Sequence, residues 1–329
     1  MKLNAAICCR TLLLVVLLAQ SALTATWAAE AYPARSIRLV VPFPPGASPN
    51  DIIGRLIGKY ITDSIGQQVI VDNRAGAGGT IGADLVAKAS PDGYTMLVTS
   101  TTLTISPNVY RKLPYDVDKD LQPVTMIGSA PMLVFVNTGV PANTLQELIA
   151  YIKARPGQFN FSSGGTGTVP HFAGELLNFM AKIRMVHVPY KGGAPAAAAM
   201  ISGEVSMYID TPTAMLQFVK QGKIKALAVA AKERFALLPE VPTAAEANLP
   251  GYELRVWYGF FVPAKTPRAI VDRLHSETVK ALSLEDVKAR LAAIGTEPAG
   301  NGPDEFKPMV QAELQKWARV ARESGIKPE

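Results

Sequence analysis

A glycine-rich loop between a short apolar segment and an amphipathic helix most strongly constrains how this chain folds. The segment Val69–Val71 has the composition of a buried strand, Gly76–Gly79 contains three glycines, and helical periodicity begins at Ile81. Backbone N–H groups at a helix start have no partner within the helix, so such a loop can bind an anion. The spacing to Gly82 does not match the dinucleotide fingerprint, and no phosphate-loop lysine follows. The segment therefore predicts an anion-binding loop, with a simple tight turn as the alternative.

Three more loops of the same kind occur along the chain. They are rich in Gly, Ser, Thr and Pro, and lie at Val41–Asp51, Ser162–Thr168 and Tyr190–Pro195. In open α/β sheets, ligands bind at the carboxyl ends of the strands, where such loops gather. Four junctions between strands and helices therefore predict one polar cleft.

Short strand-like segments alternate with helical segments through almost the whole chain. This alternation is typical of the α/β class with parallel pairing between strands. The predicted helices carry start signals, such as the capping box from Thr144 to Glu147. The strand candidates are Ile37–Val41, Val69–Val71, Thr95–Thr99, Met132–Val136, Phe159–Ser162, Met185–Val188, Ser206–Ile209, Ala226–Ala230 and Gly259–Val262.

Two longer extended segments, Pro123–Asn137 and Arg255–Pro263, are interpreted as crossings between two domains. Two crossings of this kind would form a hinge. They predict a discontinuous first domain made of residues 29–128 and 253–329, and a second domain made of residues 129–252.

The N-terminus has the pattern of a secretory signal peptide over residues 1–28. Basic residues precede the apolar run Leu12–Ala19, and small residues lead to a cleavage site after Ala28. The run is too short to span a bilayer. Cys8 and Cys9, the two cysteines of the chain, both lie in this segment. The exported chain is therefore expected to lack disulfides, thiol nucleophiles and cysteine metal ligands.

Charge and motif content argue against several classes of function. The formal net charge is +6 without basic clusters, which does not favour nucleic-acid binding. The three histidines are dispersed, and neither G-x-S-x-G nor H-E-x-x-H occurs. A hydrolase built on Ser163, His171 and Asp210 is conceivable if the three meet in one cleft. We expect no enzyme, no cofactor and no metal.

Eight short motifs form a pattern that covers nearly all of the exported chain. In this order they resemble the periplasmic solute-binding proteins of the tripartite tricarboxylate transporter family, also called Bug proteins. The motifs are Pro42-Phe43-x-Pro45-Gly46, Asn73-Arg74-x-Gly76-Ala77-Gly78-Gly79-x-Ile81-Gly82, Pro91-Asp92-Gly93-Tyr94, Lys112-Leu113-Pro114-Tyr115-Asp116, Ser162-Ser163-Gly164 followed by Pro170-His171, His187-Val188-Pro189-Tyr190-Lys191-Gly192, Leu238-Pro239-x-Val241-Pro242-Thr243-x-x-Glu246 and Trp257-Tyr258-Gly259.

The resemblance implies a two-domain periplasmic binding protein of the Venus-flytrap, type II-like kind. Each domain is then a mixed, mostly parallel sheet flanked by helices, and a small carboxylate binds in the cleft between the domains. Two departures from the family pattern stand out. The loop before Asn50 and Asp51 is one residue longer, which leaves open which of the two fills the helix-capping position. The helix after Gly193 begins with Pro195 and alanines where the family often has an acidic residue, so the rim favours a less polar solute.

The predicted ligand-binding residues come from these loops, and we expect backbone N–H groups and hydroxyls to bind more than a salt bridge does. His171 is interpreted either as a ligand contact or as a partly buried histidine bonded to the backbone. Asp210 either accepts from a ligand amino group or caps the next helix. The set is Phe43, Ala47, Ser48, Asn50, Asp51, Ala77, Gly78, Gly79, Ser100, Thr101, Ser163, Thr166, Gly167, His171, Tyr190 and Asp210.

The resemblance implies a monomeric periplasmic receptor that hands its solute to the permease subunits of a membrane transporter. The solute would be a di- or tricarboxylate, an aromatic carboxylate or an amino acid. A ligand-sensing receptor that signals to a sensor kinase is the alternative, and a hydrolase acting on a carboxylate-bearing ester or amide is a third class.

Export is expected to remove the first 28 or 29 residues, because the small residues before Glu30 suit a signal peptidase. Mass analysis of protein from the periplasmic fraction measures the cut. An exported form that retains Cys8 and Cys9 would contradict both the cleavage and the expected absence of cysteine.

Overall fold

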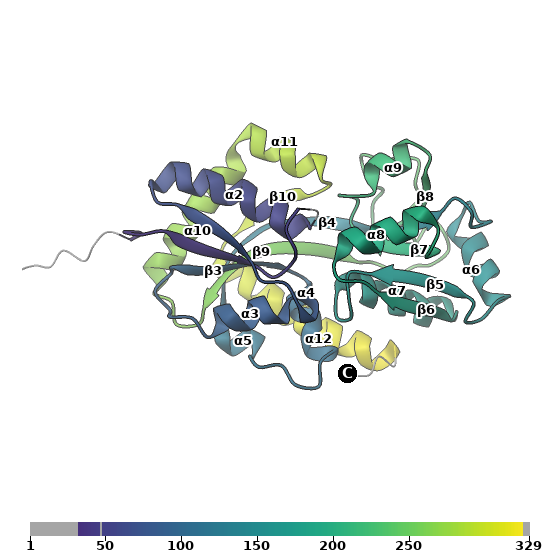
Figure 1. Ribbon diagram of the computed structural model, residues 1–329, viewed down its shortest axis with the longest axis horizontal. Coiled ribbons are helices and arrows are strands. Elements are labelled where there is room, and N and C mark those ends of the chain that lie inside the picture. The colour runs from purple at the N-terminus through teal and green to yellow at the C-terminus, as the bar shows by residue number, and fades with distance from the viewer. Residues whose placement is uncertain (1–31, 47, 325–329) are drawn as a thin grey trace, which may run out of the picture. The chain divides into compact units, whose positions relative to one another are not determined.

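A single long strand, β4 (Leu121–Asn137), runs through both halves of the sheet in the computed structural model (Figure 1). Its first half pairs with β9 (Arg255–Pro263) and β10 (Glu297–Asn301). Its second half pairs with β7 (Met207–Asp210) and β8 (Ile224–Ala230), and all four pairings are antiparallel. Nearly every residue of β4 is buried, because helices pack on it along its length.

Parallel pairing is confined to the two outer groups of strands, β2-β1-β3 and β7-β5-β6. The full order is β2-β1-β3-β9-β4-β7-β5-β6, with β10 and β8 also paired to β4. This mixed sheet with helices on its faces confirms the predicted α/β class. The remaining strands are β1 (Ile37–Val41), β2 (Val69–Asn73), β3 (Thr95–Ser100), β5 (Phe159–Ser163) and β6 (Met185–Pro189).

Helices cover both faces of each half (Figure 1). In the first half α2 and α11 lie on one face and α3, α5 and α12 on the other, and in the second half α8 and α7 lie on opposite faces. The α-helices are α2 (Pro49–Ile65), α3 (Thr80–Ala87), α4 (Thr102–Ile105), α5 (Val117–Asp120), α6 (Leu145–Lys153), α7 (Val169–Ala181), α8 (Gly193–Ser202), α9 (Leu216–Lys220), α10 (Arg268–Ser283), α11 (Glu285–Ala293) and α12 (Pro303–Ser324), and two short 3-10 helices are η1 (Ala77–Gly79) and η2 (Ser106–Asn108).

The structure describes residues 32–46 and 48–324. The predicted signal peptide with Cys8 and Cys9, and the predicted ligand contact Ala47, lie outside the described residues. Within these ranges, no helix has both the length and the apolar character that a membrane span requires.

Each half of the sheet has its own apolar core. In the first half, Met126 of β4 joins Trp257 and Phe306, whose rings meet edge to face with centroids 5.2 Å apart. In the second half, Phe135 of the same strand packs with Met200. The predicted domain boundaries at 128/129 and 252/253 stay predictions.

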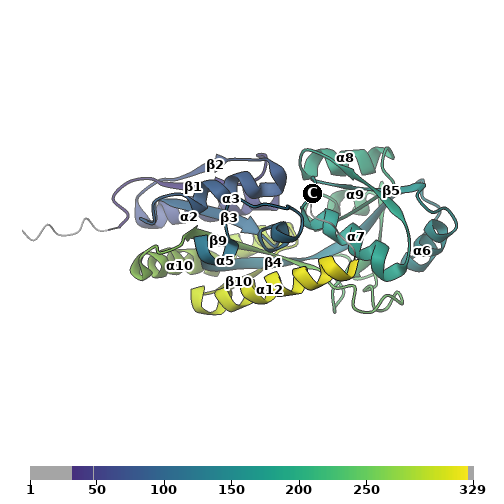
Figure 2. The same cartoon turned by 90° about the horizontal axis from the view of Figure 1, so that it is seen from below.

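The last helix, α12, extends from the first half to α7 in the second (Figure 2). Trp317 of α12 is buried. Its ring lies edge to face with Phe172 of α7, with centroids 5.4 Å apart. The C-terminal helix is therefore a second element, besides β4, that contacts both halves.

One sequence-based expectation about α2 was wrong. The helix begins at Pro49, so Ser48 occupies the capping position, and both Asn50 and Asp51 lie inside the first turn. Proline is favoured at the first helical position because it has no N–H to leave unpaired, which moves the start ahead of the polar pair.

Candidate functional site

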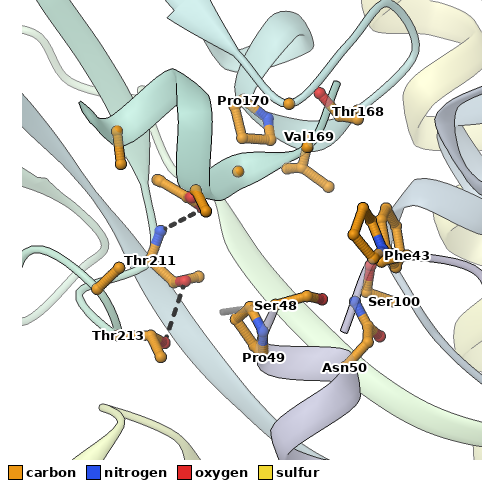
Figure 3. Close-up of a pocket in the computed structure, with 18 of the residues that line it drawn as sticks. Phe43, Ser48, Pro49, Asn50, Ser100, Thr168, Val169, Pro170, Thr211 and Thr213 are labelled. Carbon is orange, nitrogen blue, oxygen red and sulfur yellow. Dashed lines mark hydrogen bonds between the residues drawn. The ribbon is translucent and has the colours of Figure 1, made fainter. Parts of the chain in front are cut away.

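A pocket lies where three helices, α2, α7 and α8, begin (Figure 3). Figure 3 shows Ser48, Pro49 and Asn50 at the start of α2 facing residues 168–170 at the start of α7. The other lining residues come from loops and strand ends of both halves. They are Phe43, Pro44, Pro45, Ser100, Thr102, Gly164, Lys191, Gly192, Gly193, Ala194, Pro195, Ala197, Tyr208, Asp210, Thr211, Thr213, Ala214, Val256 and Tyr258.

The three helix starts leave donor groups available to the pocket. Their capping residues are Ser48, Thr168 and Gly192, and within the described chain none of these makes a side-chain capping bond. Pro49, Pro170 and Pro195 have no N–H, and the Asp51 N–H donates to the Ser48 carbonyl at 3.0 Å. The remaining N–H groups of these first turns lack partners within the helix, and the helix dipole is positive at this end. Three such ends around one cavity favour a bound anion.

Asn50 gives independent evidence that the pocket binds a polar group. Its side chain is 5% exposed, and its Oδ1 atom has no hydrogen-bond partner among the residues that the structure describes. A buried amide without partners is costly, and native proteins rarely keep one without a reason. The Asn50 Oδ1 is therefore placed to accept a hydrogen bond from a ligand, and the Nδ2 of the same amide can donate.

Asp51 holds the loop in front of α2 in place. Its carboxylate accepts hydrogen bonds from the Gly46 N–H at 2.9 Å, from Nδ2 of Asn73 at 2.8 Å and from Nε of Arg55 at 3.0 Å. Asn73 also donates to the Phe43 carbonyl at 3.0 Å. Burial alone would raise the pKa of Asp51, but these hydrogen bonds outweigh burial and lower it. Asp51 thus fixes the pocket wall without lining the pocket.

Loops of the two halves meet on both flanks of the pocket. On one flank, the Tyr110 hydroxyl donates to the Thr166 carbonyl at 3.0 Å. On the other, a Cβ added to Gly192 would lie 3.3 Å from Cγ of Pro44. Pro44 and Gly192 both line the pocket, so the two halves approach each other there.

The glycine loop at η1 allows the contact between the loops that contain Gly78 and Thr166. Gly78 and Gly79 have positive φ values of 60° and 97°, which glycine adopts without strain. A Cβ on Gly78 would lie 2.8 Å from the Thr166 carbonyl oxygen, so only glycine lets the two loops approach. Neither glycine lines the pocket.

Ser163, His171 and His187 form a buried cluster beneath the loop at 164–168. The Ser163 Oγ lies 2.6 Å from Nε2 of His187, and the two imidazoles stack with centroids 4.0 Å apart. The Gly167 N–H donates to Nδ1 of His171 at 3.3 Å, which requires that nitrogen to be unprotonated. Burial lowers the pKa of His171 to about 4, and burial together with the neighbouring His171 lowers that of His187 to about 3. Both rings are therefore neutral at pH 7.

Asp210 is a half-buried carboxylate in the pocket wall. It accepts from the Tyr208 hydroxyl and, at 2.7 Å, from the N–H of Thr211. Burial raises the pKa of Asp210 to about 6, against the lowering effect of these bonds. Because α9 begins only at Leu216, Asp210 does not cap a helix.

The structure gathers part of the predicted site. Five of the predicted contacts line the pocket, namely Phe43, Ser48, Asn50, Ser100 and Asp210. Ten others lie outside its lining, namely Asp51, Ala77, Gly78, Gly79, Thr101, Ser163, Thr166, Gly167, His171 and Tyr190.

Several of these ten have partners elsewhere in the protein. Thr101 accepts from the Trp257 N–H at 3.0 Å, and the Tyr190 hydroxyl donates to Glu204 at 2.7 Å. Many of the lining residues that the sequence reasoning missed stand at the starts of α2, α7 and α8. Their signal was present, because a proline stands within the first three positions of α2, α7 and α8, at Pro49, Pro170 and Pro195.

The described residues hold no group of three or more His, Cys, Asp or Glu side chains that could bind a metal.

The model of the tripartite tricarboxylate transporter receptor family matches residues 53–326 of the chain. This chain belongs to that family.

Two relatives are similar to this chain over most of their length. A Pseudomonas protein described as "UPF0065 protein in tcbD-tcbE intergenic region" is 41% identical over 292 residues, which cover 88% of this chain and 87% of the relative. Protein BugT of Bordetella pertussis is 36% identical over 314 residues, covering 95% and 96%.

Solved structures of similar proteins confirm the family fold, that of the periplasmic binding proteins. The R. palustris protein Rpa4515 with adipate is 34% identical and has a TM-score of 0.86, covering 91% of this chain and all of its own. MatC from Rhodopseudomonas palustris with bound malate is 34% identical and has a TM-score of 0.83, covering 88% and 100%.

Replacing Asp51, which holds the loop before α2, is expected to destabilise the protein. Asp51→Ala should lower the free energy of unfolding by about 2 kcal/mol, because the Gly46 N–H and the Asn73 amide lose a charged acceptor. Urea unfolding measures the change. Asp63→Ala on the same helix is the control, since its exposed pair with Lys59 should contribute less than about 1 kcal/mol. Equal stability of the two variants would contradict the bracing role of Asp51.

The histidine pair is expected to make stability depend on pH. Unfolded histidines take up protons below pH 6.5, whereas His171 and His187 do so near 4 and 3. Stability should therefore fall as pH drops from 6.5 towards 4, by up to about 1.4 kcal/mol per pH unit for each ring. The raised pKa of Asp210 acts in the opposite sense below pH 6.

The test therefore compares how the stability of two proteins depends on pH. Urea unfolding is measured from pH 6.5 to 5 for the original protein and for His187→Gln, in which Asp210 is unchanged. The variant should lose less stability on acidification. Parallel curves for the two proteins would contradict a depressed pKa of His187.

Proposed function

We propose that this chain is a periplasmic solute-binding protein that captures a small carboxylate in the pocket and delivers it to membrane permease subunits. The observation that carries the proposal is the meeting of three helix starts with the unpaired Oδ1 of Asn50 in one cavity. Family membership supports delivery to a permease, and the adipate and malate of two similar structures support the ligand class.

The connections between the halves support hinge closure around the solute. Strand β4 passes from one half to the other, and Leu254 forms a second crossing just before β9. The Leu254 N–H donates to the Ala230 carbonyl at 2.8 Å, and the Leu254 carbonyl accepts from the Met132 N–H at 3.1 Å. Bending at a few residues in two adjacent crossings would open the loop contacts that flank the pocket.

Binding without catalysis is part of the proposal. The Ser163 side chain is fully buried, bonds to His187 and lies outside the pocket lining. The Ser163, His171 and Asp210 arrangement of the hydrolase alternative therefore has no accessible nucleophile in this geometry. Structural relatives are described as binding proteins, which supports the same conclusion.

A larger side chain at Gly193, at the start of α8, should weaken ligand binding. Gly193 lines the pocket, its φ is not positive, and an added Cβ would make only ordinary contact with the Tyr208 hydroxyl at 3.4 Å. Gly193→Val places a branched side chain in the pocket at the start of α8, where it occupies space that the ligand needs. We expect affinity to fall at least about tenfold, or roughly 1.4 kcal/mol.

Calorimetric titration with adipate, malate, benzoate and glutamate provides the measurement. Ala198→Val on the exposed side of the same helix is the matched control and should bind as the original protein does. Equal affinity of Gly193→Val and the control, with both folded, would place the ligand elsewhere. No binding of any of the four carboxylates by the original protein would count against the proposed function itself.

A further inference from the structure

Positive side chains are scarce around the pocket. Among its described lining residues Lys191 is the only basic one, and that residue is exposed. A ligand with two carboxylates brings two charges, each of which needs donors after it leaves water. The helix starts and Asn50 supply donors for one anionic group, and no guanidinium in the lining is available for a second.

Asp210 makes the two ends of the pocket electrically different. Figure 3 shows Thr211, the neighbour of Asp210, across the cavity from Asn50. Both Asp210 oxygens already accept hydrogen bonds from the protein, which keeps this carboxyl ionised at neutral pH despite its burial. A second carboxylate at this end would face a half-buried like charge.

The walls between these ends are largely apolar. Val169, Ala197 and Val256 are each at most 5% exposed, and Phe43 and Ala214 complete this surface. The cavity volume is about 120 Å³. An apolar cavity of about 150 Å³ accommodates a benzene molecule, so this space suits a body of one six-membered ring. Burial of such a body against these walls is favourable.

We propose that the ligand is a monocarboxylate with a compact apolar body, of the size and shape of benzoate. This inference rests on the proposed function and narrows its ligand class. The carboxylate binds at Asn50 and the starts of α2 and α7, and the ring lies against Val169, Ala197 and Val256. The end of the ligand that faces Asp210 carries no negative charge.

The first test compares ligand classes on the exported protein at pH 7.5. Calorimetric titration with benzoate and cyclohexanecarboxylate is set against succinate, malate and adipate, and against phenylalanine. We expect at least one apolar monocarboxylate to bind about tenfold or more tightly than every other compound. Tighter binding of a dicarboxylate or of phenylalanine would overturn the inference and leave the proposed function standing. Binding of none of them would count against both.

A second test asks whether Asp210 sets the discrimination. Asp210→Asn keeps the shape of the side chain and an acceptor for the Tyr208 hydroxyl, but it removes the charge. The ratio of benzoate affinity to succinate affinity should fall at least about threefold, mainly because succinate binds better. An unchanged ratio in a folded variant would show that Asp210 does not exclude a second carboxylate, and the assignment of the ligand class would fail with it.

Discussion

The continuous hydrogen-bond ladder along β4 is the constraint on which the rest of the structure depends. Because one strand belongs to both halves, its register fixes where the parallel groups β2-β1-β3 and β7-β5-β6 stand along the sheet. The helices that follow β1, β5 and β6 then begin at facing edges. The pocket results from this arrangement, since its donors are the first turns of those helices.

Under the proposed function, the protein binds an anion with dipoles more than with charges. A lysine or arginine in the pocket would have to be desolvated with the ligand, at a large cost that its attraction must repay. Backbone N–H groups at helix starts are already oriented by the fold, so they lose little entropy on binding. The neutral His171 and His187 beneath the loop agree with this pattern, because burial keeps protons off both rings.

Sequence reasoning found the loops but could not assign each residue within them. The predicted strands agree with the structure because each is a short apolar run, whereas β10 (Glu297–Asn301) is polar and exists through its pairing with β4. The prediction that Val69–Val71 is buried was wrong, because β2 is an edge strand and Ile70 is 50% exposed. Ser48 and Asn50 were found because they stand at a strand–helix junction. Gly78 has the same local pattern, yet its freedom is used for contact with Thr166, a residue whose position depends on the tertiary structure.

Under the proposed function, the division of donors between the halves couples binding to closure. Asn50 and the start of α2 belong to the first half, while the starts of α7 and α8 belong to the second. A carboxylate that binds to one set alone keeps part of its hydration, and one that binds to both replaces more of that water with fixed donors. The ligand therefore stabilises the closed arrangement by the difference between these two affinities, and by no more than that. The hydrogen bond from Tyr110 and the close approach at Gly192 also join the two halves, independently of the ligand. They stabilise the closed state by themselves, so the ligand has to supply less of the free energy of closure.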